Sequence, residues 1–213
     1  MNRSKPLTAM VYEAVYSDII NGKIASDDVI TESMLIEKLG VSKSPVREAL
    51  VALCNENILR SIPRQGYMVV QISPEEIGEL AEARRALEVF MLTKSFAILT
   101  DDMIDELEAL SLANLEDSHI RTSPMDNWQR NMQFHLRLAS FAENKIMYHL
   151  LEQTLRMLTR ATTQYFLHPD DSNPLVRERS SGSRHFQLIK ACRDRDLYTA
   201  TRVLEEDIED LKQ

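Results

Sequence analysis

The sequence predicts a mainly α-helical protein of two domains: an N-terminal winged helix-turn-helix domain with a small β-hairpin wing, and a C-terminal all-α bundle of about six helices. Three observations lead to this prediction. Residues 1–72 contain three helical segments followed by a hairpin signal, residues 73–213 show only helical periodicity, and a helix-start motif lies between the two parts.

The composition is typical of a globular protein, because 44% of the 213 residues are hydrophobic and 27% are charged. The net charge of -8 is unevenly distributed, since residues 1–72 contain eight Lys and Arg and eight Asp and Glu. The N-terminal part is therefore the one suited to bind a polyanion. The two cysteines have no paired spacing, and there is no signal peptide and no long apolar run. We expect a cytoplasmic protein with reduced thiols that does not enter a membrane.

The first two helical segments are short and follow each other closely. Residues 7–20 show apolar residues about every four positions. Thr31 is predicted to cap the N-terminus of the second helix, and Gly40 to end it.

The third segment begins in "GVSKSPVREAL", residues 40–50, which starts with polar residues. We expect Ser44 to be the N-cap and Pro45 the first helical residue, since proline lacks the donor that this position would leave unpaired. Apolar residues at i, i+3, i+4 and i+7 predict the buried face, and these are Val46, Ala49, Leu50 and Leu53. The helix N-terminus would then expose a polar cluster of Ser42, Lys43, Ser44 and Arg47.

Residues 58–72 contain two β-prone runs around "PRQG", which predicts the hairpin wing. A helix that enters the major groove of DNA needs small hydroxyl residues for phosphates and an arginine or lysine that reaches guanine. The polar cluster supplies both, and Arg64 beside Gly66 at the hairpin tip is predicted to contact the DNA backbone or minor groove. The alternative is a solvated helix terminus followed by an ordinary turn, which the two preceding helices and the hairpin make less favoured.

The C-terminal part begins with "SPEE", in which Ser73 and Glu76 match a capping box. Helix breaks are expected near Thr100, at 122–126, near Asn144 and at 167–174.

Polar residues interrupt the apolar stripes of three helices in this part. They are Asn131, His135, His185 and Asp207. A lone buried carboxylate is unfavourable, so Asp207 should have a cationic partner or a metal ion. A carboxylate, two imidazoles and an amide oxygen together suit one metal ion. The alternative is that each histidine is a satisfied core residue and that Asp207 pairs with an arginine.

Arg84 also lies within an apolar stripe, one turn before Glu88. One interpretation is a salt bridge to Glu88. The other is a guanidinium that binds the carboxylate of an effector.

The segment "GVSKSPVREAL", with "GKIASDDVITESMLIEKLG" before it and "LCNENILRSIPRQGYMVV" after it, resembles the winged-helix domain of the GntR family of bacterial transcription regulators. Lys43 stands where the family usually has arginine, which keeps the charge but loses a bidentate fork. Ser26 and Asp27 stand where the family usually has Pro-Gly. The resemblance implies these DNA contacts and wing residue: Ser42, Lys43, Ser44, Pro45, Arg47 and Gly66.

The C-terminal part resembles the ligand-binding domain of the FadR-like branch of this family, in "EARRALE", "NMQFH", "AENKIM", "SRHFQLIKACRDRD" and "ATRVLEED". Metal-binding members have an aspartate four residues before the histidine of "FH", then two further histidines. Here Asn131 replaces that aspartate and Asp207 replaces the last histidine, so the carboxylate has moved across the site. The resemblance implies a divalent metal, for which zinc, nickel or manganese would fit, and an effector contact at Arg84.

The sequence thus predicts a metabolite-responsive transcription regulator, expected to be a repressor, that senses a small organic acid at a metal site. We expect a homodimer on double-stranded DNA, because a two-fold protein matches a palindromic operator. Two alternatives remain. One is a DNA-binding regulator whose buried polar cluster is only structural. The other is a metalloenzyme with a DNA-targeting domain, although no general base or nucleophile is found besides the proposed ligands.

Overall fold

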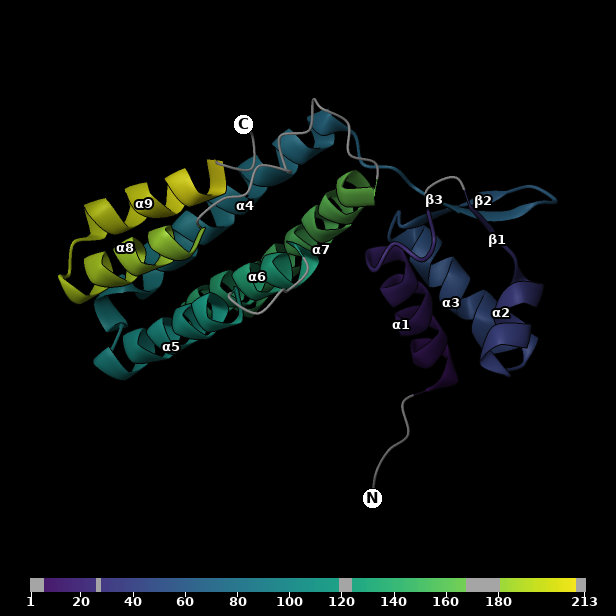
Figure 1. Ribbon diagram of the computed structural model, residues 1–213, viewed down its shortest axis with the longest axis horizontal. Coiled ribbons are helices and arrows are strands. Elements are labelled where there is room, and N and C mark those ends of the chain that lie inside the picture. Colours follow the sequence, from purple (N-terminus) through teal and green to yellow (C-terminus); the bar gives the residue numbers. More distant parts are fainter. Residues whose placement is uncertain (1–5, 26–27, 119–123, 168–180, 210–213) are drawn as a thin grey trace, which may run out of the picture. The chain divides into compact units, whose positions relative to one another are not determined.

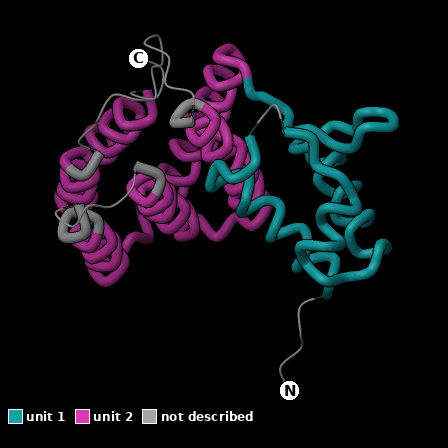
Figure 2. The backbone as a smooth tube through the Cα atoms, turned by 45° about the vertical axis from the view of Figure 1, so that its right-hand side comes forward, with its two compact units in different colours: residues 1–72 teal, residues 73–213 magenta. Residues whose placement is uncertain are grey.

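The computed structural model describes residues 6–25, 28–118, 124–167 and 181–209. The chain divides into two compact units, Met1–Ile72 and Ser73–Gln213 (Figure 2). Each unit has its own hydrophobic core.

The described residues of the first unit form three helices and a small antiparallel sheet (Figure 1). The strand order is β1-β3-β2, and β2 and β3 form the predicted hairpin. The strand β1 was not predicted, because two residues are too few to show a period. The elements are α1 (Leu7–Ile20), β1 (Val29–Ile30), α2 (Glu32–Leu39), α3 (Lys43–Asn55), β2 (Leu59–Ile62) and β3 (Gly66–Val69).

The predicted ends of α2 are confirmed, whereas the predicted start of α3 is wrong. The Oγ1 of Thr31 accepts a hydrogen bond from the backbone N–H of Met34 at 3.3 Å, and Gly40 ends α2 with φ +65°. The helix α3 begins two residues before Pro45, with Ser42 at the N-cap position. The first four N–H groups of a helix all lack an intrahelical partner, so a proline in the first turn does not define the first residue.

The predicted buried face of α3 is confirmed, since Val46, Ala49, Leu50 and Leu53 all have 0% exposure. It packs against Val11 and Val15 of α1 and other apolar residues of this unit. Burying these side chains is the main favourable contribution to the folding of the unit. Arg47 is exposed, as its place off this face predicts.

Gly66 is required by the sheet itself. Its φ is +138°, and a Cβ at this position would lie 2.3 Å from the carbonyl oxygen of Ile30 in β1. The absence of a side chain at Gly66 therefore allows a neighbouring strand of the same unit to come close to it.

The second unit is built from six α-helices in its described residues, and these residues include no strand. The short 3-10 helix η1 (Phe96–Ile98) joins the first two helices. Thr100 and Asn144 lie at helix breaks, as predicted. The break expected at 122–126 falls partly, and that at 167–174 mostly, on residues 119–123 and 168–180, outside the described residues. The helices are α4 (Pro74–Ser95), α5 (Asp101–Ser118), α6 (Pro124–Ser140), α7 (Lys145–Leu167), α8 (Ser181–Arg193) and α9 (Leu197–Glu209).

The start of α4 has the predicted capping box. The backbone N–H of Glu76 donates to the Oγ of Ser73 at 3.2 Å, and the backbone N–H of Ser73 donates to the Oε2 of Glu76 at 2.8 Å. Two of the donors at this helix end are thereby satisfied.

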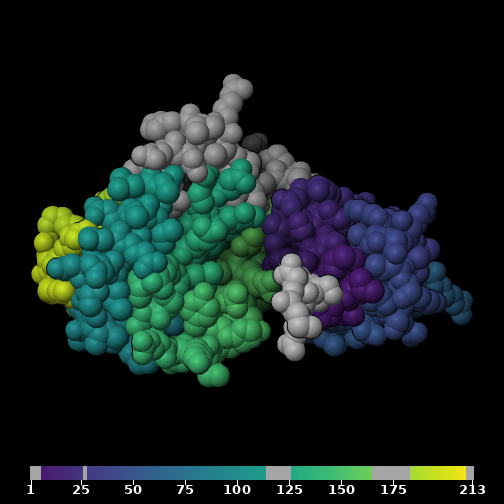
Figure 3. Space-filling view, turned by 90° about the horizontal axis from the view of Figure 1, so that it is seen from below, coloured from purple at the N-terminus to yellow at the C-terminus, as the bar shows by residue number. Residues whose placement is uncertain are grey.

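The helix α4 contacts α6, α7 and α9, and α8 packs against α5 and α9. Figure 3 shows the teal and green side chains of α5, α6 and α7 next to one another on one face of this unit. The core joins Leu92 of α4, Phe134 of α6, Leu188 of α8 and Leu204 of α9. Side chains from α4, α6, α8 and α9 therefore meet in the interior of this unit.

Candidate functional site

The exposed N-terminus of α3 carries four of the five contacts that the family resemblance implies for this helix. Ser42, Lys43, Ser44 and Arg47 are exposed. Pro45 is buried, so its ring is not part of the exposed surface at this helix end. A residue next to a polar cluster can still belong to the buried face, because neighbouring helical positions point about 100° apart.

Two of these exposed residues interact with carboxylates of the same unit. The Nζ of Lys43 lies 3.2 Å from the Oε2 of Glu32 in α2. The Oγ of Ser44 donates to the Oε1 of Glu48 at 2.9 Å. Ser42 makes no side-chain capping bond.

The carboxylate of Glu48 also accepts a hydrogen bond from the Oγ1 of Thr8 in α1, at 2.9 Å. These bonds, first from Thr8 and then from Ser44, lower the pKa of Glu48. Neither the Glu32 nor the Glu48 carboxylate was predicted from the sequence to contact these residues. The i, i+4 spacing of Ser44 and Glu48 could have predicted their hydrogen bond. The contacts of Glu48 with Thr8 and of Lys43 with Glu32 join different helices, so the sequence gives no signal for them.

Arg64 is exposed in the turn between β2 and β3, where its φ is +65°. It lies in the wing, as predicted, two residues before Gly66.

Three of the four predicted metal ligands converge in the second unit. His135 of α6, His185 of α8 and Asp207 of α9 each offer a ligand atom, and these atoms lie within 4.8 Å of one another. Their exposures are 0%, 2% and 8%. The fourth, Asn131, lies one helical turn before His135, and its Oδ1 is buried without a hydrogen-bond partner.

A chain of polar contacts links three helices through His135. The Nε of Arg84 donates to the Oε1 of Glu88 at 2.6 Å, which confirms the predicted salt bridge. The Oε2 of Glu88 lies 2.7 Å from the Nδ1 of His135. On the other side of the ring, the Oδ2 of Asp207 lies 3.0 Å from Nε2, within the distance of an ion pair.

Glu88 was predicted only as a partner of Arg84. Its contact with His135 spans 47 residues. The periodicity of a sequence does not predict contacts between distant residues. The position of Glu88, one turn after Arg84, shows only that these two residues lie on the same face of α4.

The charges in this cluster follow from burial and from the neighbouring groups. Burial raises the pKa of Asp207, but contact with His135 outweighs it and holds this pKa at about 2. Burial also opposes ionisation of Glu88, yet Arg84 and then His135 lower its pKa. Burial acts to lower the pKa of His135, but Glu88 raises it overall. Two buried carboxylates are thus kept ionised by cations.

His185 behaves differently, because burial first and the charge of His135 second lower its pKa to about 3. The ring is therefore neutral. It stacks on Phe134, with centroids 3.8 Å apart and planes 12° apart. Packing rather than hydrogen bonding orients this imidazole.

Unpaired polar atoms gather in the same cluster. Buried polar atoms in proteins usually have a partner. In the described part of the chain, three residues of this cluster have buried atoms without one: Nη1 and Nη2 of Arg84, Oδ1 of Asn131, and both ring nitrogens of His185.

The residues present fit a divalent metal ion. Imidazole nitrogens and carboxylate oxygens are ligands of zinc, nickel and manganese. With bonds of about 2.1 Å, ligand atoms on opposite sides of an ion are about 4.2 Å apart. The three ligand atoms lie within 4.8 Å of one another, so the widest spacing allowed is about 0.6 Å beyond that limit and the side chains would close slightly around an ion.

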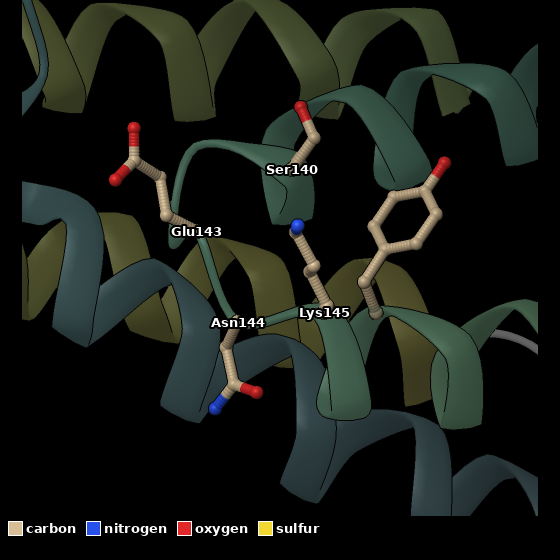
Figure 4. A pocket seen from close by; sticks show the side chains of 5 residues that line it. Ser140, Glu143, Asn144 and Lys145 are labelled. Atoms are coloured by element: carbon tan, nitrogen blue, oxygen red, sulfur yellow. The ribbon is translucent and has the colours of Figure 1, made fainter.

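A separate surface hollow of about 500 Å³ lies where α6 turns into α7 (Figure 4). None of the cluster residues lines it, so it is not the candidate site. Its lining residues are Ser140, Glu143, Asn144, Lys145 and Tyr148.

Comparison with known proteins finds two family models that match successive parts of the chain. Residues 7–69 match the model of the gntR family of bacterial regulatory proteins, and residues 79–210 match the FCD domain. The chain is a GntR-family transcription regulator with an FCD domain. The recognised family, the mainly helical fold and the all-helical second unit of the sequence prediction are confirmed.

Relatives with full-length and partial similarity point to the same class. The chain is 22% identical over 216 positions to the HTH-type transcriptional repressor RspR of Escherichia coli K12. The aligned region covers 100% of this chain and 90% of RspR. It is 34% identical over 92 positions to the gluconate operon transcriptional repressor of Bacillus licheniformis, across 43% of this chain and 37% of that repressor.

Solved structures show the same fold. McbR/YncC of E. coli matches with a TM-score of 0.77 at 21% identity, over 97% of this chain and 95% of that chain. A putative GntR regulator from Rhodococcus sp. RHA1 matches with a TM-score of 0.74 at 20% identity, over 96% and 95% of the two chains.

The GntR regulator is a DNA-binding protein and not an enzyme, so the metalloenzyme alternative is discarded. Among the helices that the structure describes, none has the length and apolar character needed to cross a membrane.

Proposed function

We propose that this GntR regulator is a repressor that responds to a small organic acid bound at a divalent metal ion in its FCD domain. The observation that carries the proposal is the buried convergence of His135, His185 and Asp207 beside several unpaired polar atoms. Each unpaired polar atom in the interior lowers the stability of the fold. A bound metal ion and acid would satisfy these atoms and remove that cost.

The metal would be held by His135, His185 and Asp207, with Asn131 as the fourth ligand. It would supply a Lewis-acid site for an oxygen of the effector. His135 would use Nε2, because its Nδ1 faces Glu88 at 2.7 Å. A carboxylate behind a ligating histidine fixes both the orientation and the tautomer of the ring.

The effector would be an acid because of Arg84. Its Nε is bound to Glu88, but Nη1 and Nη2 are buried and unpaired. Two terminal nitrogens of a guanidinium form the planar fork that suits a carboxylate. In this proposal the Nε of Arg84 makes the salt bridge to Glu88, and the two terminal nitrogens would bind the effector.

Operator DNA would be bound by the first unit, with Ser42, Lys43, Ser44 and Arg47 at the major groove and Arg64 with Gly66 in the wing. We infer a homodimer on a palindromic operator, since helix-turn-helix proteins commonly match the two-fold symmetry of their sites. The repressor role is supported by relatives that are named repressors. Action on chromosomal DNA would place the protein in the cytoplasm.

Metal content of the purified protein tests the site. Wild type should hold one metal ion per chain by mass spectrometry, and His135→Ala and His185→Ala should hold none. His149→Ala is the matched control, because the His149 side chain is 65% exposed and should leave the content unchanged. A metal-free wild type, purified without chelators, would contradict the metal.

Thermal unfolding with added acids tests the effector. A hydroxy acid or dicarboxylic acid at about 100 times its dissociation constant should stabilise the protein by about 2.7 kcal/mol. Arg84→Lys, which keeps the charge beside Glu88 but lacks the fork, should lose most of this gain.

A second candidate is a regulator whose cluster is only structural. It is favoured by the alternating charges of Arg84, Glu88, His135 and Asp207, which already balance one another. Stability that responds to no metal and to no acid would support this candidate.

A further inference from the structure

The first turn of α3 is flanked by two carboxylates, those of Glu32 and Glu48. We propose that these form an acidic clasp that withholds Lys43 and Ser44 from DNA phosphates and thereby weakens binding to DNA of arbitrary sequence. The two glutamates would then determine specificity without binding DNA themselves, because they reduce the affinity of the unit for DNA of arbitrary sequence.

The contact with Lys43 is the first arm of the clasp. The Nζ of Lys43 lies 3.2 Å from Glu32, whose side chain is 25% exposed, against 69% for Lys43. Glu32 is the first residue of α2, where the N-terminal end of the helix dipole favours a negative charge. The carboxylate is thus the better anchored partner, and Lys43 must leave it to reach a phosphate.

The contact with Ser44 is the second arm. A serine hydroxyl has one proton to donate, and Ser44 donates it to Glu48. Thr8 holds the other oxygen of the same carboxylate at 2.9 Å. Glu48 is therefore fixed from two helices, and the proton of Ser44 is not available to a phosphate oxygen while this bond persists.

The charges at this end of α3 then cancel. Lys43 and Arg47 supply two positive charges, and Glu32 and Glu48 supply two negative ones. Attraction to phosphates provides essentially all of the affinity for DNA of arbitrary sequence. A neutral helix end lacks this attraction, whereas an operator offers base contacts that offset the loss of the two pairs. Such repulsive elements raise specificity by disfavouring wrong partners.

The test is the salt dependence of binding to a mixed-sequence DNA duplex of about 30 base pairs, by fluorescence anisotropy between about 50 and 200 mM potassium chloride. Glu32→Gln should bind several-fold more tightly than wild type. Its plot of log affinity against log salt should be steeper by about 0.9, the value for one added phosphate contact.

Glu37→Gln is the control, since it removes the same charge from an exposed residue of α2 that has no ion pair among the described residues. Equal effects of Glu32→Gln and Glu37→Gln would overturn the proposal, because the change would then reflect net charge alone. Circular dichroism melting of all variants separates these effects from altered folding.

Lys43→Met supplies a second test in two backgrounds. In wild type it should change the slope by much less than 0.9, whereas in Glu32→Gln it should remove the full added contact of about 0.9. An equal change of slope in both backgrounds would show that Glu32 does not withhold Lys43. A wild type that binds no duplex at all while Glu32→Gln binds would be the strongest form of the proposed effect.

Discussion

The two polar clusters of this GntR regulator differ in how their polar groups are paired. The exposed cluster has protein partners, whereas the buried cluster contains polar atoms without one. At the exposed end of α3, Lys43 and Ser44 have protein partners although water is available to them. In the buried cluster of the FCD domain, His185 has two ring nitrogens without a partner although the side chain is almost wholly buried.

An unpaired polar atom costs little at the surface and much in the interior. The metal ion and acid proposed above would satisfy the unpaired atoms around His185. The pairs at α3 are not needed to satisfy Lys43 and Ser44, because solvent could do so. The proposed acidic clasp gives these pairs a role.

The largest effect should come from removing the charge that joins Arg84 to His135. Glu88→Ala leaves two buried groups without their anion, and breaking a buried pair costs about 3–5 kcal/mol. Urea denaturation should show a loss of this size in the free energy of unfolding. Glu79→Ala, at an exposed position of the same helix, should stay within about 0.5 kcal/mol of wild type. A small loss for Glu88→Ala would mean that the buried cluster is less tightly coupled than its distances imply.

A smaller effect is expected from Arg47, which belongs to the exposed cluster and has no part in the core. Arg47→Ala should weaken binding to an operator selected from random DNA by about 1–3 kcal/mol, the range for an arginine that reads guanine. The free energy of unfolding should not change, because the side chain is exposed. Gel-shift titration at fixed salt measures the first quantity. Arg202→Ala, on the surface of α9, removes the same charge and should leave DNA affinity unchanged.

The smallest effect compares two residues at helix N-termini. Thr31→Ala should lower the free energy of unfolding by about 1 kcal/mol, because Thr31 caps α2 through the N–H of Met34. Ser42→Ala should cost less, since Ser42 makes no side-chain capping bond. Thermal unfolding of the two variants tests this order. Equal losses would show that Ser42 serves the helix rather than DNA.

Local patterns accounted for much of the fold. The period of α3 placed Val46, Ala49, Leu50 and Leu53 in the core, and the capping box at Ser73 marked the residue before α4. The same periods exposed the candidate site, because a histidine within an apolar stripe stands out from its neighbours in the sequence pattern alone.

The features that the sequence did not predict depend on contacts between distant residues. Glu88 meets His135 across 47 positions, and Glu32 meets Lys43 from a different helix. The start of α3 was misplaced because Ser42 and Ser44 are equally good capping residues. Pro45 does not decide between them, because a proline is tolerated throughout the first turn of a helix.

The helix α4 begins at the boundary of the two units and carries Arg84 and Glu88 further along its length. Its 22 residues form a rod of about 33 Å, and the capping box at Ser73 keeps the first turn from fraying. Arg84 lies ten residues after Pro74, which is about 15 Å along the helix axis. One continuous helix therefore joins the buried polar cluster to the second residue of the FCD-containing unit.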